Sequence, residues 1–247
     1  MTNENTLTKL NEMRMNAMAE SYNEQLINPS YQELSFEERF NILVDKEWSR
    51  RKNNKLDRLI KGAGFRYSHA CIEDIEYHPD RKLDKAQILR LASCEYINER
   101  KNIIIKGASG NGKSYIACAF GMAACRNFYK VKYVRLPDLL DELTVARGEG
   151  IFQKVMKAYK KVNLLIIDEW LLSSLREHEA RDLLEIVESR YQSASTIYCS
   201  QFDSQGWYER IGEATLADAI LDRIIHDSYT IMIEGDKSMR ERYGINN

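Results

Sequence analysis

The segment IIIKGASGNGKSY, residues 103–115, decides the fold class. It opens with three apolar β-branched residues, continues through a glycine-rich stretch and runs into a helix-compatible sequence after Lys113. This order fits the pattern G-x-x-x-x-G-K-[ST], in which backbone N–H groups and the positive end of a helix surround phosphate oxygens. The segment therefore predicts a strand, a phosphate-binding turn and a helix.

Two side chains of this pattern carry specific expectations. Lys113 is expected to contact the β- and γ-phosphates of ATP, and the Ser114 hydroxyl is expected to bind Mg²⁺. The alternative is a glycine-rich turn that arose by chance, and the complete pattern between a strand and a helix argues against it.

A second motif, NLLIIDEW, places two carboxylates directly after an apolar run. Asp168 would lie at the tip of a buried strand and hold Mg²⁺, usually through water. Glu169 would accept a proton from an attacking water, which favours hydrolysis. The residues expected to contact the nucleotide are Gly107, Ala108, Ser109, Gly110, Asn111, Gly112, Lys113, Ser114, Tyr115 and Asp168.

Three further candidates have weaker support. In STIYCSQ, Ser200 and Gln201 would position the water or contact the γ-phosphate, although a merely polar strand end is equally consistent. In LADAILDRIIHD, Arg223 forms either an ion pair with Asp227 or an arginine finger that reaches the γ-phosphate of a neighbouring subunit. Arg240, in GDKSMRERY, presents the same choice.

The fold class follows from apolar runs that alternate with helical patterns. Continuous apolar strands between helices predict an α/β fold with a parallel five-stranded sheet covered on both faces, a three-layer domain. Residues 177–191 and 215–227 carry apolar stripes at helical spacing. The predicted strands are residues 102–106, 131–136, 164–167, 195–199 and 229–233.

The N-terminal part has a different, helical pattern. Residues 7–28 are predicted to form one helix that ends before Pro29. A capping box at residues 35–38 then opens a long helix that ends at residues 62–64. We expect a small all-α domain over residues 1–66 and the α/β domain over residues 67–247.

The net charge of −1 hides a basic segment. Residues 46–66 hold eight lysines and arginines against two acidic residues, so the segment carries +6 and the remainder −7. A basic helix face would bind a phosphate backbone without identifying bases, whereas the alternative is a solvated face. No aromatic stacking platform accompanies it in the sequence, which favours duplex over single-stranded DNA. The predicted DNA contacts are Arg50, Arg51, Lys52, Lys55, Arg58 and Lys61.

The composition excludes several classes of protein. Five cysteines without a CxxC pair and four scattered histidines predict neither a disulfide framework nor a zinc site. No apolar run is long enough to span a membrane, and the N-terminus lacks the features of a signal peptide. These features predict a cytoplasmic protein.

Taken together, GASGNGKS, LLIIDEW, the polar SQ pair and LADAILDR occur in the order of an AAA+ ATPase. The sequences of these motifs closely resemble those of the IstB-like transposition helper ATPases, relatives of the DnaC-type helicase loaders. The basic N-terminal segment and GDKSMRERYG near the C-terminus extend the resemblance over nearly the whole chain.

This resemblance implies roles for particular residues and for the whole protein. Residues 107–114 would be Walker A and residues 168–169 Walker B, with Ser200 or Gln201 as first sensor, Arg223 as finger and Arg240 as second sensor. It also implies ATP-dependent assembly into a ring or helical filament on duplex DNA, DNA bending, and recruitment and stimulation of a transposase.

Three alternatives stay open at this point. A replicative helicase loader would share the ATP motifs and differ in its protein partner. A small-molecule P-loop kinase would need an acceptor pocket, and Glu169 beside Asp168 argues for water as the acceptor. A non-hydrolysing DNA scaffold would use ATP only as a clamp.

Overall fold

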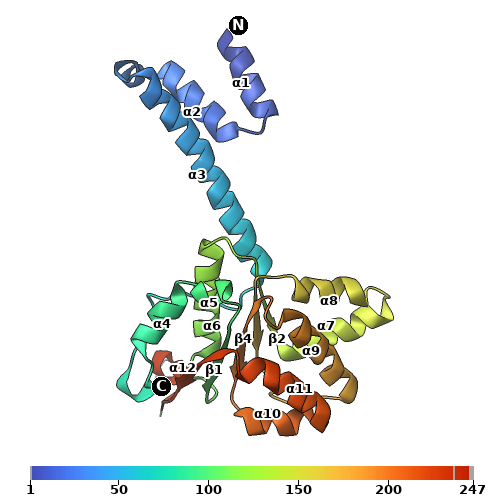
Figure 1. Ribbon diagram of the computed structural model, residues 1–247. Helices are drawn as coiled ribbons and strands as arrows, with labels where there is room; N and C mark the ends of the chain where they lie inside the picture. Colours follow the sequence, from blue (N-terminus) through green and yellow to red (C-terminus); the bar gives the residue numbers. More distant parts are fainter. Residues whose placement is uncertain (1, 236, 245–247) are drawn as a thin grey trace. The chain divides into compact units, whose positions relative to one another are not determined.

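The structure, a computed structural model, describes residues 2–235 and 237–244 (Figure 1). The chain forms two compact units, Met1–Arg58 and Leu59–Asn247, which are described separately below. The division expected after residue 66, with its functional labels, stays a prediction.

The first unit is entirely helical in its described residues. It contains α1 (Thr2–Glu12), α2 (Asn16–Ile27), the short 3-10 helix η1 (Pro29–Glu33) and most of α3 (Phe36–Ala63). The predicted capping box opens α3: the Ser35 N–H donates to the Glu38 carboxylate at 2.8 Å, and the Glu38 N–H donates to the Ser35 hydroxyl at 3.3 Å. The helix ends at Ala63, and Gly64 follows in the left-handed conformation with φ 70°, as predicted.

The single helix predicted over residues 7–28 is wrong, because the chain breaks between α1 and α2. Arg14 adopts a left-handed conformation with φ 58°. The new helix start is stabilised from outside: the buried carboxylate of Glu47 on α3 accepts the N–H groups of Ala17 at 3.0 Å and Met18 at 3.3 Å. A carboxylate at a helix N-terminus satisfies its unpaired N–H groups and complements the helix dipole.

The second unit is an α/β domain. Its elements are η2 (Pro79–Arg81), α4 (Lys85–Ala92), α5 (Glu95–Asn98), β1 (Asn102–Gly107), α6 (Lys113–Arg126), β2 (Val131–Arg135), α7 (Leu136–Gly148), α8 (Phe152–Lys160), β3 (Leu164–Asp168), α9 (Glu177–Arg190), β4 (Ser195–Ser200), α10 (Ser204–Ile211), α11 (Ala214–Ile225), β5 (Ser228–Ile233) and α12 (Met239–Tyr243).

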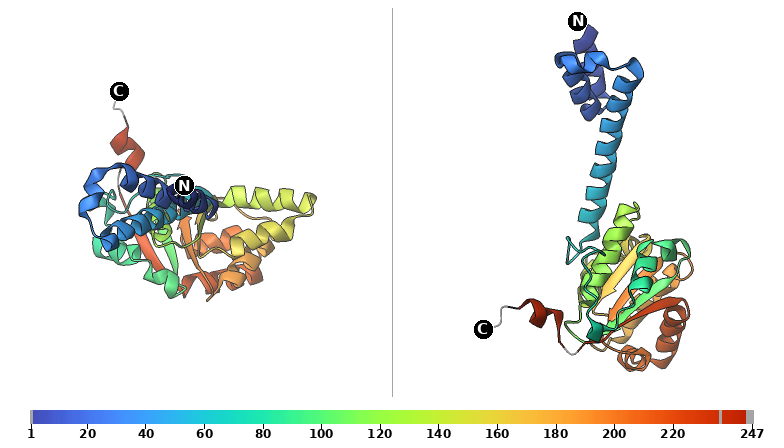
Figure 2. Two further views of the ribbon diagram at one scale, coloured as in Figure 1. Left: turned by 90° about the horizontal axis from the view of Figure 1, so that it is seen from above. Right: turned by 90° about the vertical axis from the view of Figure 1, so that its left-hand side faces the viewer.

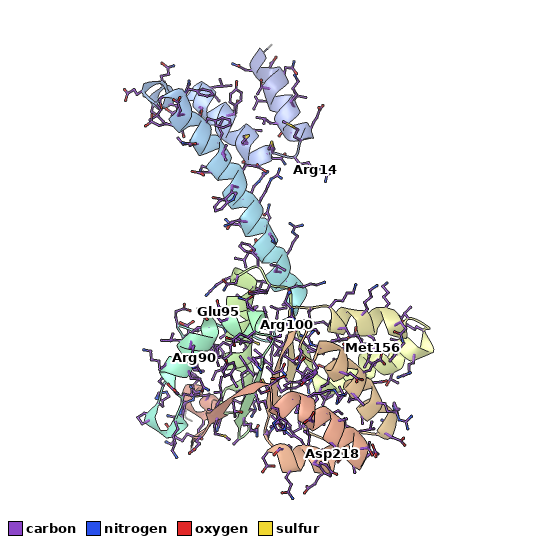
Figure 3. All side chains as sticks on the ribbon, in the orientation of Figure 1. Arg14, Arg90, Glu95, Arg100, Met156 and Asp218 are labelled. Carbon is purple, nitrogen blue, oxygen red and sulfur yellow. The ribbon has the colours of Figure 1, made fainter. Side chains whose placement is uncertain are left out.

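The five predicted strands form one parallel sheet in the order β2-β3-β4-β1-β5. The helix α6 packs on one face of it, with α4 outside, and α7 to α11 cover the other face (Figure 1). Figure 3 marks the two sides by Arg90 and Glu95 on the α4–α5 side and by Met156 and Asp218 on the other. The predicted three-layer fold is confirmed.

The sheet order brings the functional motifs together. β1 lies between β4 and β5, and β3 lies between β2 and β4, so the carboxyl ends of all five strands share one edge. In such sheets ligands bind at this edge, beyond the strand ends. Figure 2 shows α7 and α8 as a helical hairpin that extends from the body of this unit.

No helix in the described part of the chain combines the length and apolar character that a bilayer crossing requires.

Candidate functional site

The glycine-rich loop joins β1 to α6 at the carboxyl edge of the sheet. Gly110 has φ 84°, and a Cβ there would lie 2.6 Å from the Cβ of Ser238, so this position requires glycine. The Lys113 ammonium donates to the carbonyl oxygens of Gly107 at 2.7 Å and Ala108 at 2.8 Å. Burial lowers the pKa of Lys113. A bound phosphate would give the Lys113 ammonium a charged acceptor in place of the two neutral carbonyl oxygens.

Asp168 lies at the end of β3, only 2% exposed, with both oxygens engaged. Oδ1 accepts the N–H of Glu169 at 2.9 Å, and Oδ2 accepts the hydroxyl of Tyr133 at 2.7 Å. Burial, reinforced by the charge of Asp168, raises the pKa of Tyr133, so this hydroxyl remains a donor. Tyr133 therefore fixes the orientation of the carboxylate.

Glu169 follows in a left-handed conformation with φ 55°, and Leu171 has φ 52°. Such conformations cost about 1–3 kcal/mol per residue and persist where the surroundings impose them. Here the Trp170 side chain between them is fully buried, and the backbone N–H of Trp170 donates to the carbonyl of Cys199 on β4 at 2.8 Å. The burial of the indole and this backbone hydrogen bond together fix the turn that orients Glu169.

Two guanidinium groups hold the Glu169 carboxylate. Arg135 at the end of β2 places Nη2 2.8 Å from Oε2, and Arg66 places Nη1 3.7 Å from Oε1. In the register of the sheet Arg135 is opposite Asp168, which explains how β2 reaches the motif on β3.

A cavity of about 520 Å³ connects these groups. The predicted site residues that line it are Ser109, Gly110, Gly112, Lys113, Ser114, Tyr115, Asp168, Glu169, Gln201 and Arg240. Gly107 at the end of β1 and the loop residues Ala108 and Asn111 do not line the cavity. The buried Asn111 amide donates to the carbonyl of Ile233 at 3.3 Å.

The two sensor candidates occupy different environments. Ser200 is 1% exposed, and its hydroxyl donates to the Trp170 carbonyl at 3.0 Å while accepting from Trp207 Nε1 at 2.8 Å. Gln201 is exposed and lines the cavity. The geometry therefore favours Gln201 for contact with a ligand and Ser200 for support of Trp170.

Arg240 is positioned by contacts of its neighbours in α12. The N–H of Met239 donates to the carbonyl of Gly110 at 2.9 Å, and Arg242 pairs with Asp80. Tyr243 donates a hydrogen bond to Glu76. These contacts place Arg240 at the cavity beside the glycine-rich loop.

Arg223 lies outside this cavity, on α11. Its guanidinium pairs with Glu188 at 3.1 Å and donates to the carbonyl of Ala219 at 2.8 Å. The ion pair with Asp227 that the sequence suggested does not form: Arg223 pairs with Glu188, and Asp227 pairs with Lys101. A role for Arg223 in catalysis would thus require the cavity of another subunit.

The cavity suits a nucleotide with Mg²⁺. Among residues 2–235 and 237–244, no group of three or more His, Cys, Asp or Glu could hold a metal by itself. Mg²⁺ commonly takes one or two protein oxygens together with phosphate oxygens and water. The hydroxyl of Ser114 and the carboxylate of Asp168 provide that kind of incomplete oxygen set.

Comparison with known proteins identifies the family. The family model of the IstB-like ATP binding proteins matches residues 8–245. The chain belongs to this family. The insertion sequence ATP-binding protein y4pL of Sinorhizobium fredii is 40% identical over 237 residues, covering 96% of each chain. The ATP-binding protein of insertion sequence IS1162 of Pseudomonas fluorescens is 40% identical over 204 residues, which cover 83% of this chain and 88% of that protein.

Solved structures confirm the AAA+ fold of this IstB-like protein. DnaA from Aquifex aeolicus bound to AMPPCP aligns with a TM-score of 0.57 at 20% identity, over 70% of this chain and 52% of that chain. The DnaC helicase loader aligns with a TM-score of 0.55 at 19% identity, over 68% of this chain and 99% of that chain. These likenesses concern the fold.

In the IstB-like chain, two of the six predicted DNA contacts pair with a carboxylate of the same helix. Arg50 and Arg51 lie 3.1 and 2.7 Å from the carboxylate of Glu47. Although burial opposes it, the hydrogen bonds from Arg51 and from the Met18 N–H keep the pKa of Glu47 below its usual value. Lys52 lies over the ring of Trp48, at 3.8 Å from its centroid.

A second basic surface, which the sequence pattern had not predicted, lies on α8 and at its C-cap. Lys154, Lys157 and Lys161 are exposed, whereas Met156 and Tyr159 on the opposite side of the helix are buried. The lysine spacing of three and four residues was the available signal. Arg66, Tyr133 and Arg135 were missed as well, because they reach the site through tertiary structure.

Proposed function

We propose that this IstB-like protein is a Mg²⁺-dependent ATPase that assembles on duplex DNA and assists a transposase. The observation that carries the enzymatic part is the convergence of Lys113, Ser114, Asp168 and Glu169 on one cavity. The insertion-sequence names of relatives at 40% identity support the biological context.

Each residue has a defined task in this proposal. The loop N–H groups and Lys113 bind the phosphates, while Ser114 and Asp168 hold Mg²⁺, which when bound neutralises charge on the phosphates. Glu169 accepts a proton from the attacking water, and Gln201 positions that water. Arg240 contacts the phosphates from the side of α12.

These roles are tested by two substitutions in steady-state ATPase and nucleotide-binding assays. Lys113→Ala should abolish ATP binding, whereas Glu169→Gln should keep binding, stop hydrolysis and accumulate assemblies on DNA. Accumulation of a phosphorylated small molecule without free phosphate would favour the kinase alternative. Unchanged phosphate release by Glu169→Gln would contradict the role of this residue as base.

We propose that Arg223 completes the site of a neighbouring subunit. Its position outside the cavity of its own chain supports action in trans, and its pairing with Glu188 would be exchanged for the γ-phosphate on assembly. Arg223→Ala should lose DNA-stimulated hydrolysis and retain ATP binding by the monomer. Full activity and assembly of this variant would contradict a shared site.

DNA binding is proposed for the basic face of α3 and for α8. Both present lysines or arginines at helical spacing, which suits a phosphate backbone. Electron microscopy with duplex DNA under ATP, ADP or no nucleotide tests assembly directly. A ring or filament should form with ATP, and reversal of Lys154, Lys157 and Lys161 to Glu should weaken it if α8 contacts DNA.

The helicase-loader alternative has the weaker support. The likeness to DnaC concerns the fold at 19% identity, whereas relatives named for insertion sequences match nearly the whole chain. Pull-down with a replicative helicase and with a cognate transposase would separate the two. Retention of the helicase alone would favour a loader.

A further inference from the structure

The segment Gly64–Tyr67 joins the end of α3 to the nucleotide site, and it is fixed there by Phe65. A Cβ added to Gly121 in α6 would lie 2.8 Å from Ile166 Cδ1 on β3 and would overlap the ring of Phe65. Glycine inside a helix costs about 1 kcal/mol relative to alanine, so this close approach gives it a reason. Phe65 thus packs against the helix that follows Walker A and the strand that ends in Walker B.

Arg66 extends from this anchored position to the reactive part of the site. Its guanidinium is 3.7 Å from Glu169 Oε1, beyond the usual length of a direct hydrogen bond. Its side chain is 39% exposed and lines the cavity that also contains Lys113 and Asp168. Glu169 therefore holds Arg66 loosely. Arg66 also has Tyr133 as a hydrogen-bond partner and lies 5.7 Å from the centroid of the Tyr67 ring, and the adjoining cavity leaves space for its guanidinium to contact a phosphate.

Arg135 differs from Arg66 both in its distance to Glu169 and in the cavity that it lines. It makes the shorter contact with Glu169, at 2.8 Å, and it lines a second cavity beside β2 but not the nucleotide cavity. Arg66 alone of this pair borders both cavities. Of the two guanidinium groups at Glu169, Arg66 is the one that bound nucleotide would meet.

We infer that Arg66 is a nucleotide-sensing residue that binds the γ-phosphate of ATP within its own subunit and so distinguishes ATP from ADP. A terminal phosphate carries more negative charge than one carboxylate, and the planar guanidinium fork matches its oxygens. On ATP binding Arg66 exchanges Glu169 for the phosphate, which releases one restraint on the base. Because Gly64 ends α3 two residues earlier, the exchange also reports nucleotide state to the end of the basic helix.

This inference rests on the proposed ATP site, and the first test is binding selectivity. Affinities for ADP and for a non-hydrolysable ATP analogue are measured at protein concentrations that keep the chain monomeric. Arg66→Ala should weaken binding of the ATP analogue about tenfold or more and change ADP binding less than about twofold, since a hydrogen bond to a charged group is lost only with ATP. Arg66→Lys should fall between, because it keeps the charge without the fork.

A matched control and a second measurement separate sensing from a structural role. Arg181→Ala removes an arginine that pairs with Glu177 on the exposed face of α9 and lines no part of the cavity, so it should change neither affinity. Hydrogen exchange of residues 59–66 should slow with the ATP analogue but not with ADP in the parent protein, and Arg66→Ala should lose this difference.

Equal loss of ATP and ADP affinity in Arg66→Ala, or no loss of either, would overturn the inference. Failure of the proposed ATP site is a separate result, because it would appear as undiminished nucleotide binding by Lys113→Ala. Arg66→Lys keeps the test valid if the alanine variant proves unstable.

Discussion

The guanidinium of Arg135 lies 2.8 Å from the Glu169 carboxylate, which joins the end of β2 to the residue proposed as the catalytic base. Asp138 adds a weaker contact to the same arginine at 3.6 Å. A carboxylate held by a guanidinium is restrained from turning toward a water molecule. The ion pair therefore restrains the residue proposed as the base.

Arg135→Ala should raise the DNA-independent ATPase rate, because it removes the shorter of the two restraints on Glu169. An ion pair of this exposure contributes up to about 1 kcal/mol, which corresponds to an increase in the ATPase rate of up to about fivefold. Phosphate release without DNA measures it, with Arg181→Ala as the control. A drop to the level of Glu169→Gln would show instead that Arg135 is required for hydrolysis.

Ser200→Ala and Gln201→Ala should have opposite effects: the first should lower stability, and the second should slow ATP hydrolysis. Ser200→Ala removes the acceptor of Trp207 Nε1 and the donor to the Trp170 carbonyl, so it should lower the free energy of unfolding by about 1–3 kcal/mol. Gln201→Ala should leave stability unchanged and slow hydrolysis at saturating ATP. Thermal unfolding and single-turnover hydrolysis of both variants check this.

The reverse pattern, a stable Ser200→Ala variant with slow chemistry and a fully active Gln201→Ala variant, would assign the sensor to Ser200. The sequence placed both residues at one strand tip and left the choice open. The burial of the Ser200 hydroxyl beside Trp170 and the position of Gln201 at the cavity separate them in the structure.

The sequence predicted the parts of the fold that depend on local pattern. Five largely apolar runs predicted the five strands, and the signal was strongest for β3 and β4, because parallel strands buried on both faces consist of continuous apolar residues. The break at Arg14 was missed because no glycine or proline marks it and because the cap comes from Glu47, which is distant in sequence. Arg66 and Arg135 were missed for the same reason, since their partner Glu169 reaches them only in the folded sheet.

Glu47→Gln should steepen the salt dependence of DNA binding. Six phosphate contacts by α3 predict a slope of about −5 in log affinity against log salt. If Glu47 keeps Arg50 and Arg51 away from DNA, four contacts remain, and the expected slope is about −4. The substitution removes the charge that holds both arginines. Fluorescence anisotropy with a duplex between about 50 and 200 mM salt measures the slope.

Glu37→Gln is the matched control for this prediction, because it removes an exposed acidic residue in the first turn of the same helix. It should leave the slope unchanged. If Glu47→Gln also leaves it unchanged, Arg50 and Arg51 do not contact DNA. Glu47→Gln should in addition weaken the start of α2, seen as faster hydrogen exchange at Ala17 and Met18.

Arg190→Met should destabilise the α/β unit more than any surface substitution. Arg190 is 2% exposed, and it donates to the carbonyl oxygens of Tyr159 at 3.0 Å and Val162 at 2.9 Å and to the Thr196 hydroxyl at 3.0 Å. Burial lowers its pKa to about 10. Methionine fills similar space but leaves these buried acceptors without a donor, at about 1–3 kcal/mol each.

We expect the free energy of unfolding to fall by about 3 kcal/mol or more, whereas Arg181→Met on the exposed face of α9 should change it by less than about 0.5 kcal/mol. Urea unfolding followed by tryptophan fluorescence in a Trp48→Phe background reports on the second unit, because Trp170 and Trp207 are buried there. Arg190→Lys should be nearly as damaging, since one ammonium cannot reach acceptors on α8, β4 and the loop before β3. A loss below about 1 kcal/mol in Arg190→Met would mean that water satisfies these carbonyls and that Arg190 does not join the three elements.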